Sequence, residues 1–209
     1  MNGLIPAVLA ISFLIGSIPF GLLIARIYKV KNLRGQGSGN IGATNVSRVL
    51  GFWPAGAATF FLDFLKGVLP VLVLMIPGFR GWWSDSLHGP EITQSFVWAT
   101  ALFSVLGHCY SPWLRFNGGK GVATAFGAIL VLSPVAAGVA IAAFGLTFYG
   151  TRIGSLSSIT GVLVAVIAHL VFEPAGLHLW FGAALVFVIL IRHQSNLDAL
   201  LEDKENRFA

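Results

Sequence analysis

Charged residues are scarce in this chain. They make up 10% of its 209 residues, whereas hydrophobic residues make up 56% and the mean hydropathy is +0.83. An average soluble domain has about 25% charged residues, so the composition excludes an ordinary soluble domain. The apolar runs are long and continuous rather than alternating, which argues against a transmembrane β-barrel. The chain is therefore predicted to be an all-α polytopic membrane protein.

Cysteine is nearly absent as well. Cys109 is the only one, so no intramolecular disulfide can form. The first apolar run, from residue 3 to 27, has no basic residue before Arg26, so it lacks the charged start of a signal peptide. We expect this run to be a retained membrane span. No basic tract points to nucleic acid and no repeat is visible, so we expect residues 1–209 to form a single integral-membrane domain.

The apolar segments predict how often the chain crosses the membrane. A spanning helix needs about 20 mostly apolar residues, and five segments approach or exceed this length: 4–27, 54–77, 93–110, 155–173 and 175–191. Segment 122–150 is too long for one span, because at 1.5 Å per residue it would measure about 43 Å against a core of about 30 Å. Ser133 and Pro134 interrupt it near the middle, which predicts two shorter helices.

If segment 122–150 forms two helices, the chain has seven transmembrane helices. The distribution of basic residues favours this number. With seven spans, the loops 28–53, 111–121 and 150–154 share one face with the tail that follows the last span. That face carries most of the positive charge: Arg26, Lys29, Lys31, Arg34, Arg48, Arg115, Lys120, Arg152, Arg192, Lys204 and Arg207. The opposite face has only Arg80, in a predicted outer loop at 78–92. Cytoplasmic loops are rich in Lys and Arg, so we expect the N-terminus outside and the C-terminus in the cytoplasm.

The first polar stretch runs from Gly37 to Asn45. Its glycines fit the dinucleotide-binding pattern G-x-G-x-x-G, but the end of a membrane helix precedes it and no βαβ unit fits around it. Its polar residues suit a phosphate instead, because they combine hydroxyl, amide and guanidinium groups: Ser38, Asn40, Thr44, Asn45 and Arg48. Arg48 follows Thr44 by four residues, so the two share a face if the stretch is helical. A flexible turn without function is the alternative.

The second polar stretch, from Phe116 to Gly121, surrounds Lys120 with three glycines. It is not a nucleotide-binding P-loop, because Leu114 occupies the position of the first P-loop glycine and Gly121 that of the Ser or Thr after the lysine. Glycines let backbone N–H groups approach an anion, and the helix expected from residue 122 adds its positive N-terminus. The alternative is a cytoplasmic loop whose lysine only sets the topology.

Two further groups of polar residues lie in or next to spans. Asp63 and Lys66 are one turn apart within an apolar segment, where charges are rare unless paired or facing a cavity. They form either a structural ion pair or, through Lys66, part of a site. His193 and Asn196 are one turn apart just after the last span. The histidines show no spacing typical of metal ligands, so no metal site is predicted.

Together these motifs resemble the bacterial acyl-phosphate:glycerol-3-phosphate acyltransferase family (PlsY type) over nearly the whole chain. The matching motifs are Gly37 to Asn45 followed by Arg48, Asp63-x-x-Lys66-Gly67, Gly107-His108-x-x-Ser111-Pro112, Phe116-x-Gly118-Gly119-Lys120-Gly121-Val122-Ala123-Thr124, Thr151-Arg152-x-x-Ser155-Leu156 and Arg192-His193-x-x-Asn196. The resemblance implies a seven-helix enzyme of the inner membrane with a cytoplasmic site. It also implies synthesis of 1-acyl-glycerol-3-phosphate, the first step of phospholipid synthesis, from acyl phosphate without a cofactor.

The resemblance, together with the polar patterns described above, assigns roles to residues. Those expected to carry catalysis are Ser38, Arg48, Lys120, His193 and Asn196. Those expected to bind substrate are Gly118, Gly119, Gly121, Thr44, Asn45, Ser158 and Lys66. Glu205 and Asp63 are expected to be structural. The tail departs from the family pattern, since Asp198, Ala199 and Asp203 replace commonly basic or glycine positions.

The predicted reaction is attack of the glycerol-3-phosphate hydroxyl on a mixed anhydride, with phosphate leaving. Arg48 and Lys120 would offset the charge of two phosphates, and the base is either His193 or, as we favour, a substrate phosphate. Three alternatives remain: a transporter of an anionic metabolite, a scaffold, and an acyltransferase that uses a thioester donor. The last rests on His193-x-x-x-x-Asp198, a short pattern that we interpret as coincidence. The sequence leaves the oligomeric state open.

Overall fold

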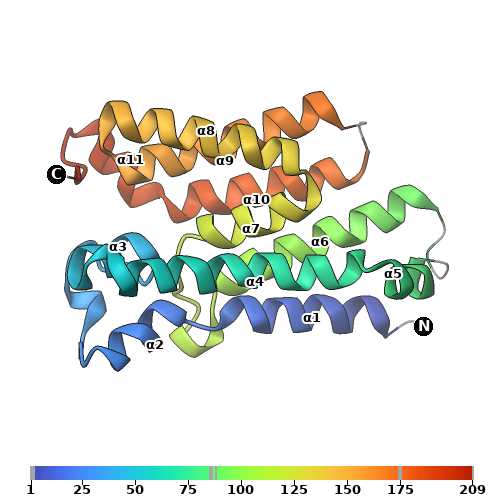
Figure 1. Ribbon diagram of the computed structural model, residues 1–209, viewed down its shortest axis with the longest axis horizontal. Coiled ribbons are helices and arrows are strands. Elements are labelled where there is room, and N and C mark those ends of the chain that lie inside the picture. The colour runs from blue at the N-terminus through green and yellow to red at the C-terminus, as the bar shows by residue number, and fades with distance from the viewer. Residues whose placement is uncertain (1–2, 85–86, 88, 174–175, 209) are drawn as a thin grey trace.

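The computed structural model describes residues 3–84, 87, 89–173 and 176–208, and these contain helices and no strand. Figure 1 shows the long helices running along a common axis. The helices are α1 (Leu4–Ser17), α2 (Phe20–Ile27), α3 (Ala43–Leu50), α4 (Ala57–Met75), α5 (Pro77–Ser84), α6 (Pro90–Cys109), α7 (Val122–Leu132), α8 (Pro134–Thr151), α9 (Gly154–Phe172), α10 (His178–Arg192) and α11 (Gln194–Leu201). Three short turns of helix complete them: η1 (Leu33–Gly35), η2 (Phe52–Gly56) and η3 (Pro112–Leu114).

Four helical segments are long and apolar enough to cross a membrane: Leu4–Ile27, Phe52–Met75, Pro134–Thr151 and Gly154–Phe172. A fifth arises if α10 and α11, which meet at an angle of 59°, are counted together. The prediction of an all-α membrane protein is therefore confirmed. Helix α7 has only 11 residues, shorter than a full span, so the count of seven remains a prediction.

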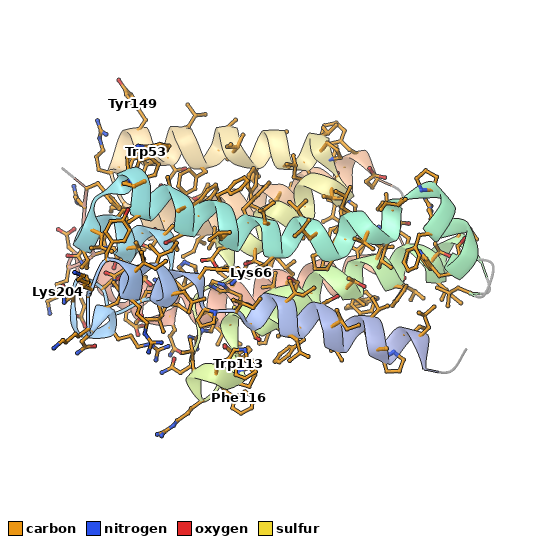
Figure 2. All side chains as sticks on the ribbon, turned by 60° about the horizontal axis from the view of Figure 1, so that its bottom comes forward. Trp53, Lys66, Trp113, Phe116, Tyr149 and Lys204 are labelled. Atoms are coloured by element: carbon orange, nitrogen blue, oxygen red, sulfur yellow. The ribbon has the colours of Figure 1, made fainter. Side chains whose placement is uncertain are left out.

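The outer surface agrees with a membrane environment. Figure 2 labels four large aromatic side chains, namely Trp53, Trp113, Phe116 and Tyr149, of which Tyr149 extends clearly outward. All of them are exposed, as are many leucine, isoleucine and phenylalanine side chains. Such a surface is unfavourable in water and favourable in lipid, where tryptophan and tyrosine collect near the interfaces.

The predicted break in segment 122–150 is confirmed. Helix α7 ends at Leu132, and Pro134 is the first residue of α8. Proline is well suited to this position, because it lacks the N–H that the first turn leaves unpaired. One other prediction about a connection is wrong: segment 78–92 is not all loop, since α5 covers Pro77–Ser84. The tail after Arg192 contains α11.

Helix α5 forms because its Trp83 has a place to be buried. Its indole N–H donates to the Leu74 carbonyl at 3.1 Å, and its ring meets that of Phe96 edge-on at 5.3 Å. A tryptophan in an outer loop would lie at the membrane interface, but only 1% of Trp83 is exposed. Residues 85, 86 and 88 of the predicted loop, and residue 175 of the predicted last span, lie outside the described part of the chain.

Small residues let the helices approach closely. A Cβ atom at Gly16 would lie 2.0 Å from the Ser104 carbonyl oxygen, so α1 and α6 are in backbone contact there. A Cβ atom at Gly67 would lie 1.9 Å from the Thr124 carbonyl oxygen, where α4 meets α7. Packing of this kind is the usual basis of helix association in lipid. It brings the start of α7, and the glycine-rich loop before it, against α4 and α6.

Figure 1 also shows where the ends of the helical bundle lie. Helix α1 begins at the right-hand end of the view, whereas α2, α3 and α11 gather at the left-hand end. The chain therefore enters and leaves the bundle at opposite ends, as an odd number of crossings requires. The first polar stretch and the tail, far apart in sequence, share the left-hand end.

Candidate active site

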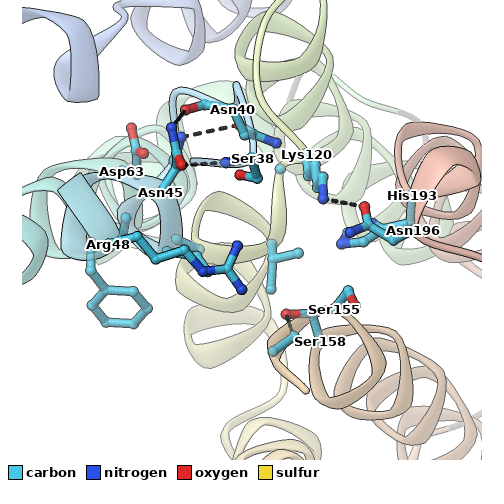
Figure 3. A pocket seen from close by; sticks show the side chains of 18 of the residues that line it. Ser38, Asn40, Asn45, Arg48, Asp63, Lys120, Ser155, Ser158, His193 and Asn196 are labelled. Carbon is cyan, nitrogen blue, oxygen red and sulfur yellow. Dashed lines mark hydrogen bonds between the residues drawn. The ribbon is translucent and has the colours of Figure 1, made fainter. Parts of the chain in front are cut away.

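One cavity brings together the first polar stretch, the second polar stretch and the pair of His193 and Asn196. Figure 3 shows Arg48 on one side of it, Lys120, His193 and Asn196 on another, and Ser155 with Ser158 below. Of the predicted site residues, the cavity is lined by Ser38, Thr44, Asn45, Arg48, Asp63, Lys120, Gly121, Ser158, His193, Asn196 and Glu205. Gly118, Gly119 and Lys66 are not among the lining residues.

Asn45 shapes the first polar stretch. Its side chain is fully buried, and its Oδ1 atom accepts a hydrogen bond from the Ser38 N–H at 2.7 Å. Its Nδ2 atom donates to the carbonyls of Asn40 at 2.8 Å and Gln36 at 3.1 Å. These bonds tie residues 36–40 to the first turn of α3. Asn45 therefore holds the loop that carries Ser38, and the substrate contact expected for it stays a prediction.

Helix α3 presents Thr44 and Arg48 to the cavity. The stretch is helical from Ala43, so the expected shared face of these two residues exists. The Arg48 guanidinium lies 4.8 Å from the centre of the Phe208 ring, and its Nη2 atom lies 3.4 Å from the Asn206 carbonyl oxygen. The other guanidinium N–H groups are available to an anion in the cavity.

Hydrogen bonds hold the glycine-rich loop both through its N–H groups and through its carbonyl groups. The N–H groups of Gly118 and Gly119 donate to the carbonyls of Cys109 and His108, both at 3.0 Å. Arg192 in turn donates to the Gly118 carbonyl at 2.7 Å and the Gly119 carbonyl at 3.1 Å. These two amides are thus already paired and do not form the predicted anion nest. The glycines instead permit close packing, since a Cβ atom at Gly119 would lie 2.1 Å from Nε2 of His108.

Lys120 extends from this loop into the cavity. Its ammonium group donates a hydrogen bond to Oδ1 of Asn196, and Nδ2 of Asn196 donates to Glu205 at 2.7 Å. Burial, together with the charges of Arg48 and Arg192, lowers the pKa of Lys120 from 10.5 to about 8, and Glu205 only partly offsets this. Lys120 is therefore positively charged at neutral pH, and a bound anion would stabilise this partly buried charge.

Glu205 bridges two helices beside the cavity, although the tail differs from the family pattern. Its Oε1 atom accepts hydrogen bonds from Ser155 Oγ and from Asn196 Nδ2, both at 2.7 Å. It therefore joins α9 to α11 and fixes which way the Asn196 amide points. Because Glu205 holds the nitrogen of that amide, the oxygen faces Lys120. The sequence pattern did not predict that Ser155 binds Glu205.

His193 lies at the bend between α10 and α11, with 1% of it exposed. Its Nδ1 atom is 2.8 Å from the Ile189 carbonyl oxygen. A carbonyl only accepts, so Nδ1 carries the proton. In the neutral ring Nε2 then has a free lone pair. The geometry gives His193 the tautomer that a general base needs, and the residue lines the cavity.

Lys66 is held within the helices. Its ammonium group is 2.7 Å from Asp63, 2.9 Å from Nδ1 of His108 and 2.9 Å from the Ile18 carbonyl oxygen. Of the two sequence-based alternatives, the structure therefore shows the ion pair. Asp63 and His108 line the cavity, and His108 supports the glycine-rich loop. Within the described residues, no group of three or more His, Cys, Asp or Glu side chains is arranged to hold a metal.

A second cavity continues from the first and is almost entirely apolar. Five residues line both cavities: Phe60, Val122, Ala123, Phe144 and Ser158. The remainder of the second cavity lies between α7, α8 and α9, with Phe126, Ile129, Ala140, Ile141, Gly161, Val162 and Ala165. The pair of cavities therefore fits a molecule with an anionic head and an apolar tail.

Comparison with known proteins agrees with this chemistry. The model of the glycerol-3-phosphate acyltransferase family matches residues 6–203. The chain belongs to this family. A glycerol-3-phosphate acyltransferase of Dinoroseobacter shibae is 43% identical over 210 residues, which cover 98% of this chain and 93% of the relative. One of Anaeromyxobacter sp. (strain Fw109-5) is 40% identical over 202 residues, or 95% and 93% of the two chains.

Two solved structures of the family share the fold. Both are crystal structures of PlsY (YgiH), an integral membrane glycerol 3-phosphate acyltransferase. The glycerol 3-phosphate form has a TM-score of 0.86 and 36% identity, covering 98% of this chain and 96% of its own. The lysophosphatidic acid form has a TM-score of 0.84 and 35% identity, covering 98% and 95%. This family member is thus an integral membrane acyltransferase.

Proposed function

We propose that this family member transfers a fatty acyl group from acyl phosphate to the 1-hydroxyl of sn-glycerol 3-phosphate. The products are 1-acyl-glycerol-3-phosphate (lysophosphatidic acid) and inorganic phosphate. The acyltransferase activity follows from membership of the family. The observation that supports both substrates is the joining of a cationic polar cavity to an apolar one. Glycerol 3-phosphate fits only the first, whereas an acyl phosphate needs both.

In the proposed reaction the substrate hydroxyl oxygen attacks the acyl carbonyl carbon. A carbon–oxygen bond to glycerol forms, the bond to phosphate breaks, and phosphate leaves with the electron pair. Phosphate is a good leaving group, so no covalent intermediate with the protein is needed. The hydroxyl proton passes to Nε2 of His193 or to a phosphate oxygen of the substrate. Both routes are compatible with the cavity, because His193 lines it.

Two phosphates repel each other, so the protein must supply positive charge between them. Arg48 and Lys120 stand on different sides of the cavity (Figure 3) and are assigned this task. Ser38, Thr44 and Ser158 add hydroxyl groups, and Asn196 adds its amide. Fixed positions and fixed charges of this kind account for catalysis without a nucleophilic side chain.

The proposed location is the inner membrane, with the cavity at the cytoplasmic side. The concentration of Lys and Arg in the segments around the cavity supports this orientation. Seven crossings with the N-terminus outside are part of the same proposal, and the opposite ends at which the chain enters and leaves the bundle support them (Figure 1). Reporter enzymes fused to each terminus test this: both reporters active on one side of the membrane would contradict it.

The decisive experiment compares acyl donors. Purified protein in detergent is given labelled glycerol 3-phosphate with acyl phosphate, acyl-CoA or acyl carrier protein of the same chain length. We expect labelled lysophosphatidic acid with acyl phosphate alone. Product from a thioester donor would overturn the donor assignment. The transporter alternative has no observation in its favour, and turnover in detergent, where transport has no meaning, would exclude it.

A further inference from the structure

The segment after α11 borders the cavity at Glu205 and reaches Arg48. Residues 204–208, here called the strap, are not helical and follow the range matched by the family model, which ends at residue 203. Glu205 anchors the start of the strap through Ser155 and Asn196. The strap then passes Arg48, on the other side of the cavity. It therefore links α9 and α11, which Glu205 contacts, to Arg48 of α3.

Phe208 ends the described part of the strap and meets Arg48. The guanidinium carbon lies 4.8 Å from the ring centre, a cation–π distance. The Asn206 carbonyl oxygen lies 3.4 Å from Nη2 and adds a second contact from the strap. A ring that covers one face of the planar guanidinium leaves its N–H edge uncovered. That edge is the part that binds a phosphate with two parallel hydrogen bonds.

Phe208 is itself held in place. Its backbone N–H donates to the Arg152 carbonyl at 2.8 Å, between α8 and α9. Its ring meets the Phe148 ring edge-on, with centres 5.5 Å apart. The ring is thus anchored independently of Arg48. Because the Phe208 ring is held by other contacts, it can restrict the conformation of the Arg48 side chain. A ring without such contacts would move together with the arginine.

We propose that Phe208 is a positioning residue that orients Arg48 toward a substrate phosphate. The inference rests on the proposed function, which puts Arg48 in the phosphate site. An arginine has many rotamers, and binding a phosphate normally requires it to give them up. Phe208 imposes that order before the substrate arrives, so binding is stronger than with a mobile side chain. The strap therefore serves substrate affinity and takes no part in bond formation.

The test replaces the Phe208 ring with non-aromatic side chains of similar size. Phe208→Leu and Phe208→Met remove the cation–π contact, and we expect each to raise the KM of a phosphate substrate about fivefold with kcat within about twofold. Phe208→Tyr keeps the ring and should restore the KM. Arg207→Ala is the matched control, because that neighbour faces Asp203 at the surface. Melting temperatures in detergent establish that every variant is folded.

A double variant separates this inference from the proposed function. In an Arg48→Lys background there is no planar guanidinium to orient, so Phe208→Leu should change KM less than it does in the parent protein. An unchanged KM in both ring-less variants would overturn the role of Phe208. A lower KM would also overturn it, because the strap would then compete with phosphate. Unaltered kinetics of Arg48→Ala would instead refute the proposed site itself.

Discussion

Lys120 and Asn196 lie 76 positions apart in the sequence, yet the Lys120 ammonium donates a hydrogen bond to Oδ1 of Asn196. The contact joins the glycine-rich loop before α7 to the first turn of α11. Glu205 determines the direction of the bond, because it holds the nitrogen of the same amide at 2.7 Å. The three residues form a chain of alternating donors and acceptors that points one cation into the cavity.

Removal of that cation should impair substrate binding. We expect Lys120→Ala to raise the KM for glycerol 3-phosphate about 10- to 100-fold or to abolish activity, because a charge-assisted hydrogen bond to phosphate is lost. Steady-state kinetics with acyl phosphate in excess measure this. Lys204→Ala is the control, since 73% of that side chain is exposed and its partner is Glu202. Equal kinetics of Lys120→Ala and the parent protein would remove Lys120 from the site.

The lowered pKa of Lys120 predicts a fall in activity at alkaline pH. The free enzyme loses the ammonium charge as pH rises through about 8, so kcat/KM should decline above that value. Lys120→Arg should keep its charge and show no such decline, even if its activity is lower at every pH. A decline at the same pH in the arginine variant would assign the titration to another group.

The same shift affects stability with a definite sign. Between about pH 8 and 10.5 the unfolded chain binds the Lys120 proton while the folded chain has released it. The contribution of Lys120 to the free energy of unfolding therefore rises with pH across this window. Melting temperatures of the substrate-free protein should rise less over that range in Lys120→Met, which has no proton to release.

The tautomer of His193 makes the choice of base testable. His193→Gln keeps a side chain that can hydrogen-bond but cannot accept the proton. If Nε2 of His193 is the base, kcat should fall about 100-fold or more, with little change in KM. If a substrate phosphate takes the proton, as we favour, kcat should fall less than about tenfold. Single-turnover rates measure the chemical step directly and separate these outcomes.

Much of the fold could be predicted because lipid imposes simple rules. Apolar length located α4, α6 and α9, and a proline located the break between α7 and α8. Helix α5 was missed for a physical reason. It has only eight residues, too short to form from local preference alone, so it depends on tertiary contacts such as the burial of Trp83.

The site was predictable in composition and less so in detail. Residue types and spacing indicated that Arg48, Lys120 and Asn196 handle phosphate, and one cavity contains all three. The sequence does not reveal where backbone N–H groups are directed, so the pairing of Gly118 and Gly119 with carbonyls was not foreseen. Phe208 was missed because the sequence does not show that this phenylalanine of the tail contacts Arg48.

The buried pair of Asp63 and Lys66 should matter for stability. Lys66→Met leaves a carboxylate without its 2.7 Å partner in an apolar region, which costs about 3–5 kcal/mol. The melting temperature in detergent should then fall by roughly 10 °C. The double variant Asp63→Leu/Lys66→Met removes both charges and should recover most of this loss. A double variant as unstable as the single one would show that the ion pair is not the cause.

The apolar cavity should select the length of the acyl chain. Ser158 borders both cavities, and Ala165 lies seven residues further along α9, about 10 Å from it. A larger side chain at Ala165 should therefore fill the far part of the apolar cavity and leave the polar part intact. We expect Ala165→Phe to lower kcat/KM for acyl phosphates of 16 carbons at least tenfold while those of eight carbons react nearly as before. Phe187→Ala, at a 64% exposed position of α10 that borders neither cavity, is the control. Equal losses for short and long donors would show that the tail lies elsewhere.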